Sequence, residues 1–282
     1  METVGILADS AIRARSVFSI IRGVDEMDQT TQAFPPDADL LAALSGGLAS
    51  PRKIGVLSAT SLEAETEAGF QKAKAGLIKL GHTLVEIDLP SLKYASPAYY
   101  TIATAEASAN LARFDSIRYG NRPDWAENPE ELINKARGAG FGAEVKLRIL
   151  LGTFVLRSGF QDRYYLRAQR IRDYIKRDFN RILSGPSKVD AILLPVFPTR
   201  AFGRGEEGLS SFAQKAADLY TCCANLAGLP ALSFQASVEA GLPVGVQLVG
   251  PAFSEASLFD LVEAYEAAHP AQHPTGYKAF WS

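Results

Sequence analysis

Three polar side chains stand in apolar surroundings where an unpaired charge would be costly. Arg148 interrupts a run of leucine and isoleucine, and Asp218 precedes an apolar segment that begins with Leu219. An arginine in such a place either extends its head to water or pairs with a carboxylate, and a buried aspartate needs a partner too. Tyr99 adds a hydroxyl group on a rigid ring. Because Arg and Asp together could hold the carboxylate and the ammonium of an α-amino acid, the three are candidate ligand-binding residues.

An activated nucleophile is not evident in the sequence. There is no Gly-x-Ser-x-Gly elbow and no Ser-x-x-Lys with its supporting motifs. Ser45-Gly46-Gly47 is the nearest Ser/Gly-rich stretch, and it has no partner lysine motif. Cys222 and Cys223 are adjacent and have no recognisable base, so core packing is favoured over nucleophilic chemistry. The three histidines have no zinc-ligand spacing to the cysteines, and we predict no metal site.

The composition is that of a globular protein in a reducing compartment. The 282 residues are 47% hydrophobic, and the formal net charge is -2 with a pI of about 6.0. This balance argues against direct binding of a polyanion. Two adjacent cysteines provide no disulfide framework, which predicts a cytoplasmic setting. No signal peptide and no run of about 18 apolar residues is present, so we expect no membrane association.

Hydrophobic periodicity and turn residues predict an α/β fold in which helices cover a mixed β-sheet. A parallel strand–helix–strand unit is expected over 53–58, 61–80 and 83–89. Further strands are expected at 189–194, 231–238 and 244–249, the last two flanking a turn at Gly241-Leu242-Pro243. Helices are expected from about 9 to 22 and over 101–114, 143–159, 162–183 and 254–268.

Two of these helices suggest surfaces that meet something else. The first helix carries an apolar side of Ile12, Val17, Phe18 and Ile21, although the first strand begins only near residue 53. Such a side needs a partner surface, so the sheet is expected to be incomplete on its N-terminal side. The helix over 162–183 carries seven Arg and Lys residues. A solvated face is the simpler explanation, and a surface that meets tRNA or a partner subunit is the other.

Longer motifs resemble the amidase-signature family. The segments 225–230 and 241–247 are similar to amidase-signature proteins in general, and residues 2–8 resemble the strand that follows the family's nucleophile region. The segments 97–115, 117–120, 140–149 and 151–154 resemble more closely the A subunit of the aspartyl/glutamyl-tRNA(Asn/Gln) amidotransferases. Residues 159–172 add to this likeness. Pro195-Val196-Phe197-Pro198 departs from the family's Pro-Thr-x-Pro, which puts the local loop shape in doubt.

The resemblance implies an amidase-signature fold over 1–282 as one domain, matching the C-terminal part of the family. It places substrate glutamine on Tyr99, Arg148 and Asp218, with Arg148 at the α-carboxylate and Asp218 at the α-ammonium. The family's catalytic lysine and two serines would lie upstream, so no catalytic residue is expected here. Ammonia would pass to the partner B and C subunits, where ATP, Mg²⁺ and most of the tRNA contacts are expected. Two alternatives stay open: a non-catalytic amino-acid-binding paralogue, and a fragment of another small-amide amidase.

Overall fold

The computed structural model describes residues 3–33, 50–58, 61–203 and 217–273. It contains two compact units, which are described separately. Unit 1 comprises Met1–Lys93 and Ile175–Ser282, and unit 2 comprises Tyr94–Tyr174. The single domain over 1–282 stays a prediction, and Ser45-Gly46-Gly47 lies outside the described residues.

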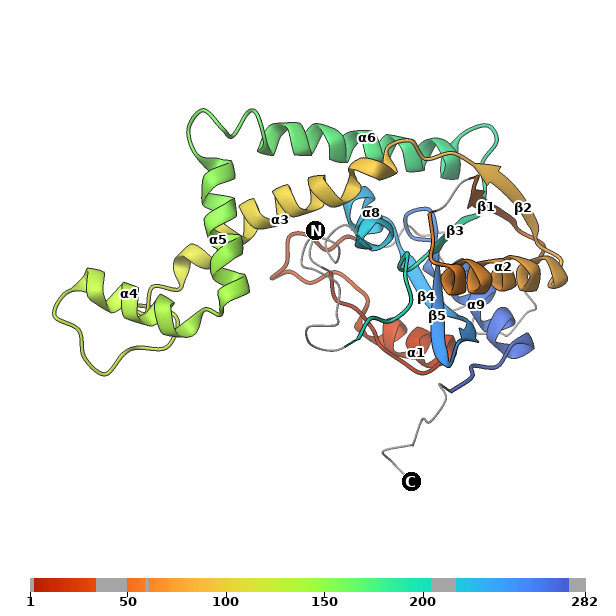
Figure 1. Ribbon diagram of the computed structural model, residues 1–282, viewed down its shortest axis with the longest axis horizontal. Coiled ribbons are helices and arrows are strands. Elements are labelled where there is room, and N and C mark those ends of the chain that lie inside the picture. The colour runs from red at the N-terminus through yellow and green to blue at the C-terminus, as the bar shows by residue number, and fades with distance from the viewer. Residues whose placement is uncertain (1–2, 34–49, 59–60, 204–216, 274–282) are drawn as a thin grey trace, which may run out of the picture. The chain divides into compact units, whose positions relative to one another are not determined.

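A five-stranded mixed sheet forms the centre of unit 1 (Figure 1). Its order is β2-β1-β3-β5-β4, where β1 pairs in parallel with β2 and β3, and β5 pairs antiparallel with β3 and β4. The predicted parallel unit and mixed sheet are therefore confirmed. The strands are β1 (Lys53–Leu57), β2 (Thr83–Ile87), β3 (Ala191–Pro195), β4 (Ala231–Glu239) and β5 (Leu242–Val249).

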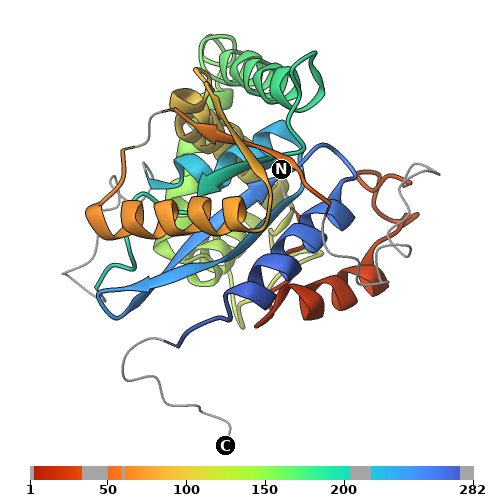
Figure 2. The ribbon, with the colours of Figure 1, turned by 90° about the vertical axis from the view of Figure 1, so that its right-hand side faces the viewer.

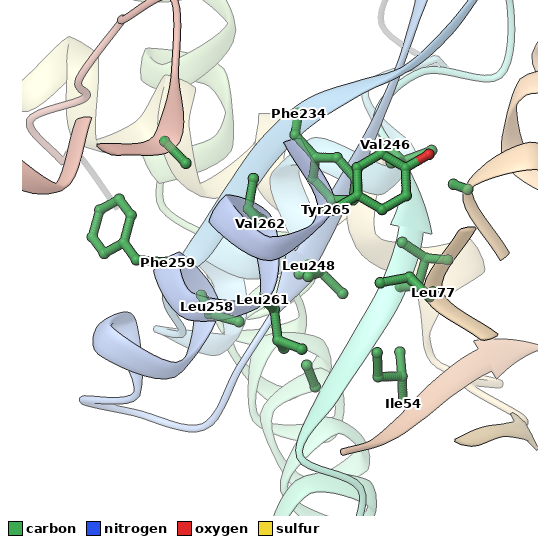
Figure 3. Packing of buried hydrophobic residues seen from close by; sticks show 14 of the residues in the cluster. Ile54, Leu77, Phe234, Val246, Leu248, Leu258, Phe259, Leu261, Val262 and Tyr265 are labelled. Carbon is green, nitrogen blue, oxygen red and sulfur yellow. The ribbon is translucent and has the colours of Figure 1, made fainter. Parts of the chain in front are cut away.

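Helices cover both faces of this sheet. On one face α2 (Ala64–Lys79) and α9 (Glu255–Ala268) close the core, where Leu77 and Tyr265 meet Val246 and Leu248 of β5 (Figure 3). Because side chains alternate along a strand, Gln247 points to the opposite face. There its Nε2 donates to the backbone oxygen of Tyr220, at 2.8 Å, in α8 (Leu219–Ala227).

Helix α1 (Ala11–Ile21) lies beside α9 (Figure 2). Its buried residues are Ala11, Ala14 and Arg15, and Phe18 packs against Phe259 at 5.9 Å. The other members of the predicted apolar side, Ile12, Val17 and Ile21, are exposed. The face that packs on α9 also carries Arg15, whose guanidinium pairs with two carboxylates of α9, Asp260 and Glu263.

The segment before α1 forms no strand. Residues 3–8 are irregular, and within the described chain none of them makes a backbone–backbone hydrogen bond. Ile6 packs against the core, while Val4 and Leu7 are exposed. The strand that residues 2–8 resemble is therefore not formed over its described part, because no described strand lies alongside to supply the ladder.

Unit 2 is helical. Its elements are α3 (Ala95–Asn110), α4 (Pro129–Gly140), α5 (Ala143–Leu156) and the first part of α6 (Tyr165–Ser184). Residues 97–183 were expected to be mainly helical, but α4 was not predicted as a separate helix. Asn128 caps it by accepting a hydrogen bond from the backbone N–H of Glu131 at 2.9 Å. Helix α3 starts six residues earlier than predicted, because Pro97 occupies the first turn, where its missing N–H costs nothing.

Candidate functional site

Tyr99 lies in the second turn of α3 and is half-buried. Its ring meets that of Tyr100 edge to face, with ring centroids 5.3 Å apart. Neighbouring residues on a helix point about 100° apart, so this contact restricts the rotamers of both rings. Tyr99 therefore presents a positioned aromatic ring with a hydroxyl, and its ligand-binding role stays a prediction.

Arg148 lies on the surface of α5. Its Nε is 3.3 Å from the Oε1 of Glu144, one helical turn earlier, and its side chain is 49% exposed. Pairing with a carboxylate was one of the two predicted environments, although the pair is exposed and weak. The surrounding Leu147, Leu150 and Leu151 are exposed as well. A ligand carboxylate could therefore reach the guanidinium and compete with Glu144.

Close packing of α3 on α5 joins the elements that carry Tyr99 and Arg148. The contact depends on Gly152, because a Cβ at this position would lie 2.0 Å from the backbone oxygen of Thr104 and 2.7 Å from the Cβ of Ser108. Only glycine allows the two backbones to approach so closely. Two of the three predicted residues therefore stand on one rigid pair of helices.

Asp218 is the N-cap residue of α8 in unit 1. Its backbone oxygen accepts hydrogen bonds from the N–H of Cys222, at 3.0 Å, and from the hydroxyl of Thr221, at 3.1 Å. Its carboxylate makes no capping bond within the helix. The side chain is half-buried, and a carboxylate beside a helix N-terminus is favoured by the helix dipole.

The start of α8 lies at the carboxyl end of β3. Gln247 connects them, since its Nε2 donates both to the backbone oxygen of Pro195, at 3.1 Å, and to that of Tyr220. In open α/β sheets, ligands bind outside the carboxyl ends of the parallel strands. Asp218 therefore lies at the carboxyl end of the parallel strands, where a ligand site is expected.

The two cysteines of α8 are poor nucleophiles. Cys222 and Cys223 are both buried and form no disulfide. Burial, with a smaller effect of the Asp218 carboxylate, raises the pKa of the Cys222 thiol to about 12. Burial raises the pKa of Cys223 as well. A reactive cysteine needs a lowered pKa, so the predicted packing role is confirmed.

A cavity of about 240 Å³ also opens near the carboxyl end of β3. It was not predicted, because no local motif brings its lining together. Its walls are mainly apolar, and Arg200 at its rim pairs with Glu65 at 3.4 Å. The hydroxyl of Thr66 is buried and has no hydrogen-bond partner among the described residues. The lining residues are Thr66, Val196, Phe197, Thr199, Arg200, Ala201, Phe202, Pro243, Val244 and Gly245.

The three predicted residues fall in different units. Tyr99 and Arg148 belong to unit 2, and Asp218 belongs to unit 1. A joint clamp of the three therefore stays a prediction. Over the described ranges, no helix is long and apolar enough to cross a membrane, and no three His, Cys, Asp or Glu side chains gather as metal ligands would.

Sequence comparison places the chain beside known amidases. The amidase family profile matches residues 1–259. The chain is 43% identical over 278 residues to the A subunit of the Azotobacter vinelandii glutamyl-tRNA(Gln) amidotransferase, covering 97% of this chain and 56% of that protein. It is 43% identical over 270 residues to the Allorhizobium ampelinum counterpart, covering 92% and 52%. The chain thus spans about half the length of these relatives, of which it resembles the C-terminal part.

Solved structures show the same fold. The A subunit of the Thermotoga maritima glutamyl-tRNA(Gln) amidotransferase superposes with a TM-score of 0.70 at 32% identity, covering 93% of this chain and 52% of that one. The peptide amidase of Stenotrophomonas maltophilia superposes with a TM-score of 0.69 at 24% identity, covering 96% and 54%. The second likeness concerns the fold alone. Both confirm the predicted amidase-signature architecture.

Proposed function

Because the chain belongs to the amidase family, we propose that it acts as part of an amidotransferase A subunit that binds glutamine. The complete enzyme would release ammonia from the side-chain amide and supply it for conversion of Glu-tRNA(Gln) to Gln-tRNA(Gln). The observation that carries this proposal is 43% identity, over nearly the whole chain, to proteins named as A subunits of glutamyl-tRNA(Gln) amidotransferases.

The proposed binding chemistry is charge complementarity. The guanidinium of Arg148 would bind the α-carboxylate of glutamine, and the carboxylate of Asp218 would bind its α-ammonium. Tyr99 would limit the position of the substrate through its ring and hydroxyl. The exposed Glu144–Arg148 pair supports this assignment, since exchange of one carboxylate partner for another costs little at an exposed site.

This chain is proposed to bind without catalysing. The family's lysine and two serines have no counterpart that we recognise in the sequence, and positioning residues cannot replace a nucleophile. The B and C subunits are the proposed partners, with ATP and Mg²⁺ bound on a partner and tRNA held mainly there. The cytoplasm is the proposed location. Ammonia release from glutamine by the purified 282-residue chain would contradict this part of the proposal.

Isothermal titration of the chain with glutamine tests the binding role. We expect Arg148→Met and Asp218→Asn each to weaken binding at least tenfold, which corresponds to about 1.4 kcal/mol. Arg157→Met is the matched control, because Arg157 is an exposed arginine directly after α5. The glutamine assignment is wrong if Arg148→Met and Arg157→Met bind glutamine equally well.

The cavity beside Val196 and Phe197 favours one second candidate, an amidase for small apolar amides. Its lining is mainly apolar, and these two residues replace the Thr-x of the family's Pro-Thr-x-Pro motif. Titration with benzamide distinguishes the two functions. Binding of benzamide that Phe197→Asp abolishes, together with no binding of glutamine, would favour the small-amide amidase. The third candidate is a non-catalytic amino-acid-binding paralogue. It would be favoured if the chain alone were a stable monomer that binds glutamine tightly.

A further inference from the structure

The segment from Arg157 to Tyr174 in unit 2 has a strong excess of positive charge. It contains five arginines and no lysine, whereas Asp162 and Asp173 are its only acidic residues. The net charge of -2 for the whole chain does not show this concentration, because acidic residues elsewhere outweigh it. A polyanion requires a concentrated basic surface rather than a basic protein, so this segment is a candidate for binding one.

The first half of α6 holds part of this charge in a fixed orientation. The hydroxyl of Tyr165 donates a hydrogen bond to the Oε1 of Glu106 in α3, at 2.7 Å, which fixes the inner side of the helix. Arg167, Arg170 and Tyr174 follow the spacing i, i+3, i+7 and so share another face, about 10 Å long, turned away from Tyr165. All three side chains are exposed.

Arg163 extends this face by one turn. The chain is already helical just before α6, because the backbone N–H of Tyr164 donates to the backbone oxygen of Phe160 at 3.0 Å. Arg163 therefore stands one helical turn before Arg167, and it is exposed as well. We name Arg163, Arg167 and Arg170 the arginine face.

Repulsion within the arginine face is not relieved by acidic neighbours. Arg167 has an arginine four residues earlier and another three residues later, and like charges at these spacings destabilise a helix. Elsewhere in unit 2 the same spacing joins opposite charges, as in the pairs Glu131–Lys135 and Glu144–Arg148. None of the three arginines forms an ion pair with a residue that the structure describes. A polyanion would neutralise this charge.

We propose that the arginine face binds the phosphate backbone of double-stranded RNA. Arginine suits phosphate because its planar guanidinium stays charged and donates two parallel hydrogen bonds to two oxygens. Tyr174, which is 38% exposed, adds a hydroxyl that can donate to a further phosphate oxygen. An acidic protein fits less well, since protein interfaces have an apolar centre and this face has no aliphatic side chain.

This inference goes beyond the proposed function, in which tRNA is held mainly by a partner. It depends on the charges of α6 and not on glutamine chemistry. A negative glutamine titration would therefore leave it standing, and a failure to bind RNA would leave the glutamine assignment standing.

Fluorescence anisotropy of a labelled RNA hairpin, titrated with the full chain, tests the proposal. We expect the double variant Arg167→Met/Arg170→Met to raise the Kd about tenfold at low salt and to reduce the slope of log K against log salt by about one per arginine removed. Arg167→Lys/Arg170→Lys should keep the slope, because the charge is retained. Arg13→Met is the matched control, since Arg13 is an exposed arginine of α1, and it should change the Kd less than about twofold.

Three outcomes would overturn the proposal. The first is no binding of the hairpin at low salt, and the second is an equal loss in Arg13→Met and the double methionine variant. The third is displacement of the RNA by a poly-glutamate peptide at a lower concentration than by unlabelled hairpin, since the partner would then be an acidic protein. The melting temperature of the double methionine variant should not fall, because both side chains are exposed. If it does fall, the lysine variant decides: retained binding supports the proposal, and lost binding overturns it.

Discussion

At the scale of single residues, Arg15 is a buried charge that links α1 to α9. Its side chain is 4% exposed, and its Nη2 and Nε lie 2.5 Å from Asp260 and 2.9 Å from Glu263. The guanidinium also lies 5.5 Å from the ring centre of Phe259. A cation held so deeply cannot lose its partners cheaply, because desolvation is then uncompensated.

Replacement of Arg15 should therefore destabilise the protein. We expect Arg15→Met to lower the free energy of unfolding by about 2–3 kcal/mol, somewhat below the range for fully buried pairs, because both carboxylates are partly exposed. Urea unfolding followed by circular dichroism measures the loss. Arg13→Met should cost less than about 0.5 kcal/mol, because the Arg13–Asp9 pair is exposed. Equal losses would mean that the buried network contributes no more than a surface pair.

Glu255 gives a pH-dependent prediction. Burial raises the pKa of its carboxyl group, and its Oε2 has no hydrogen-bond partner in the described chain. A raised folded-state pKa favours the protonated form, so this group's contribution to stability is present at low pH and is lost as the pH rises through the folded-state pKa. Glu255→Gln should therefore stabilise the protein at pH 7. The gain should vanish below about pH 4, near the unfolded pKa.

Thermal unfolding between pH 4 and pH 7 measures this effect. The exposed Glu26→Gln is the control and should show no pH-dependent gain. A gain for Glu255→Gln that is the same at both pH values would show that the carboxyl charge is not its cause.

At the scale of elements, the contact between α3 and α5 in unit 2 requires a glycine at position 152. The backbone oxygen of Thr104 occupies the space where any side chain at Gly152 would begin. Helices packed this closely leave no room for an added methyl group, which would force them apart.

Gly152→Ala should therefore destabilise unit 2 by about 2–3 kcal/mol, despite the higher helix propensity of alanine. Gly138→Ala is the matched control. Gly138 lies within α4, and a methyl group added there would meet no atom within 4 Å apart from its chain neighbours and the nearby backbone of its own helix, so the same change should stabilise by up to about 1 kcal/mol. Chemical denaturation compares them, and a stabilising Gly152→Ala would show that α3 and α5 can separate freely.

The elements were predictable from sequence where the signal is local. The strand–helix–strand unit at 53–87 and the last helix, with Leu258 and Tyr265 buried, follow directly from periodicity and turn residues. Helix α8 was missed because it is only nine residues long, which is too short to show a clear helical periodicity. The predicted turn is displaced to Ala240-Gly241, both of which have positive φ, so Leu242 and Pro243 belong to β5.

The candidate site was predictable in part for the same reason. The Glu144–Arg148 spacing of four residues shows in the sequence that the two side chains can meet on a helix. Gln247 bonds to Tyr220, which lies 27 positions earlier in the chain, and to Pro195, which lies 52 positions earlier. No local sequence pattern encodes these two hydrogen bonds. Contacts of this kind place Asp218 at the carboxyl end of β3, and they follow only from the three-dimensional fold.

At the scale of the whole molecule, the exposed apolar side chains of α1 should govern how the chain behaves in solution; they are Ile12, Val17, Ile20 and Ile21. Exposed apolar surface promotes non-specific association. We expect Ile20→Asp to lower hydrophobic-dye binding by the isolated chain and to raise its solubility severalfold. Ile78→Asp should do so less, because Ile78 has few exposed apolar neighbours on α2. Static light scattering and dye fluorescence compare the two variants, and an equal effect would mean that the exposed side chains of α1 do not drive association.

The Arg15 network also has a consequence for the order of synthesis. Arg15 and its partner Asp260 are 245 residues apart in the chain. At a synthesis rate of 5–20 residues per second, α1 leaves the ribosome roughly 12–50 s before the helix that accepts its buried cation. During that interval α1 has no α9 to pack on, so unit 1 cannot be completed until α9 has been synthesised.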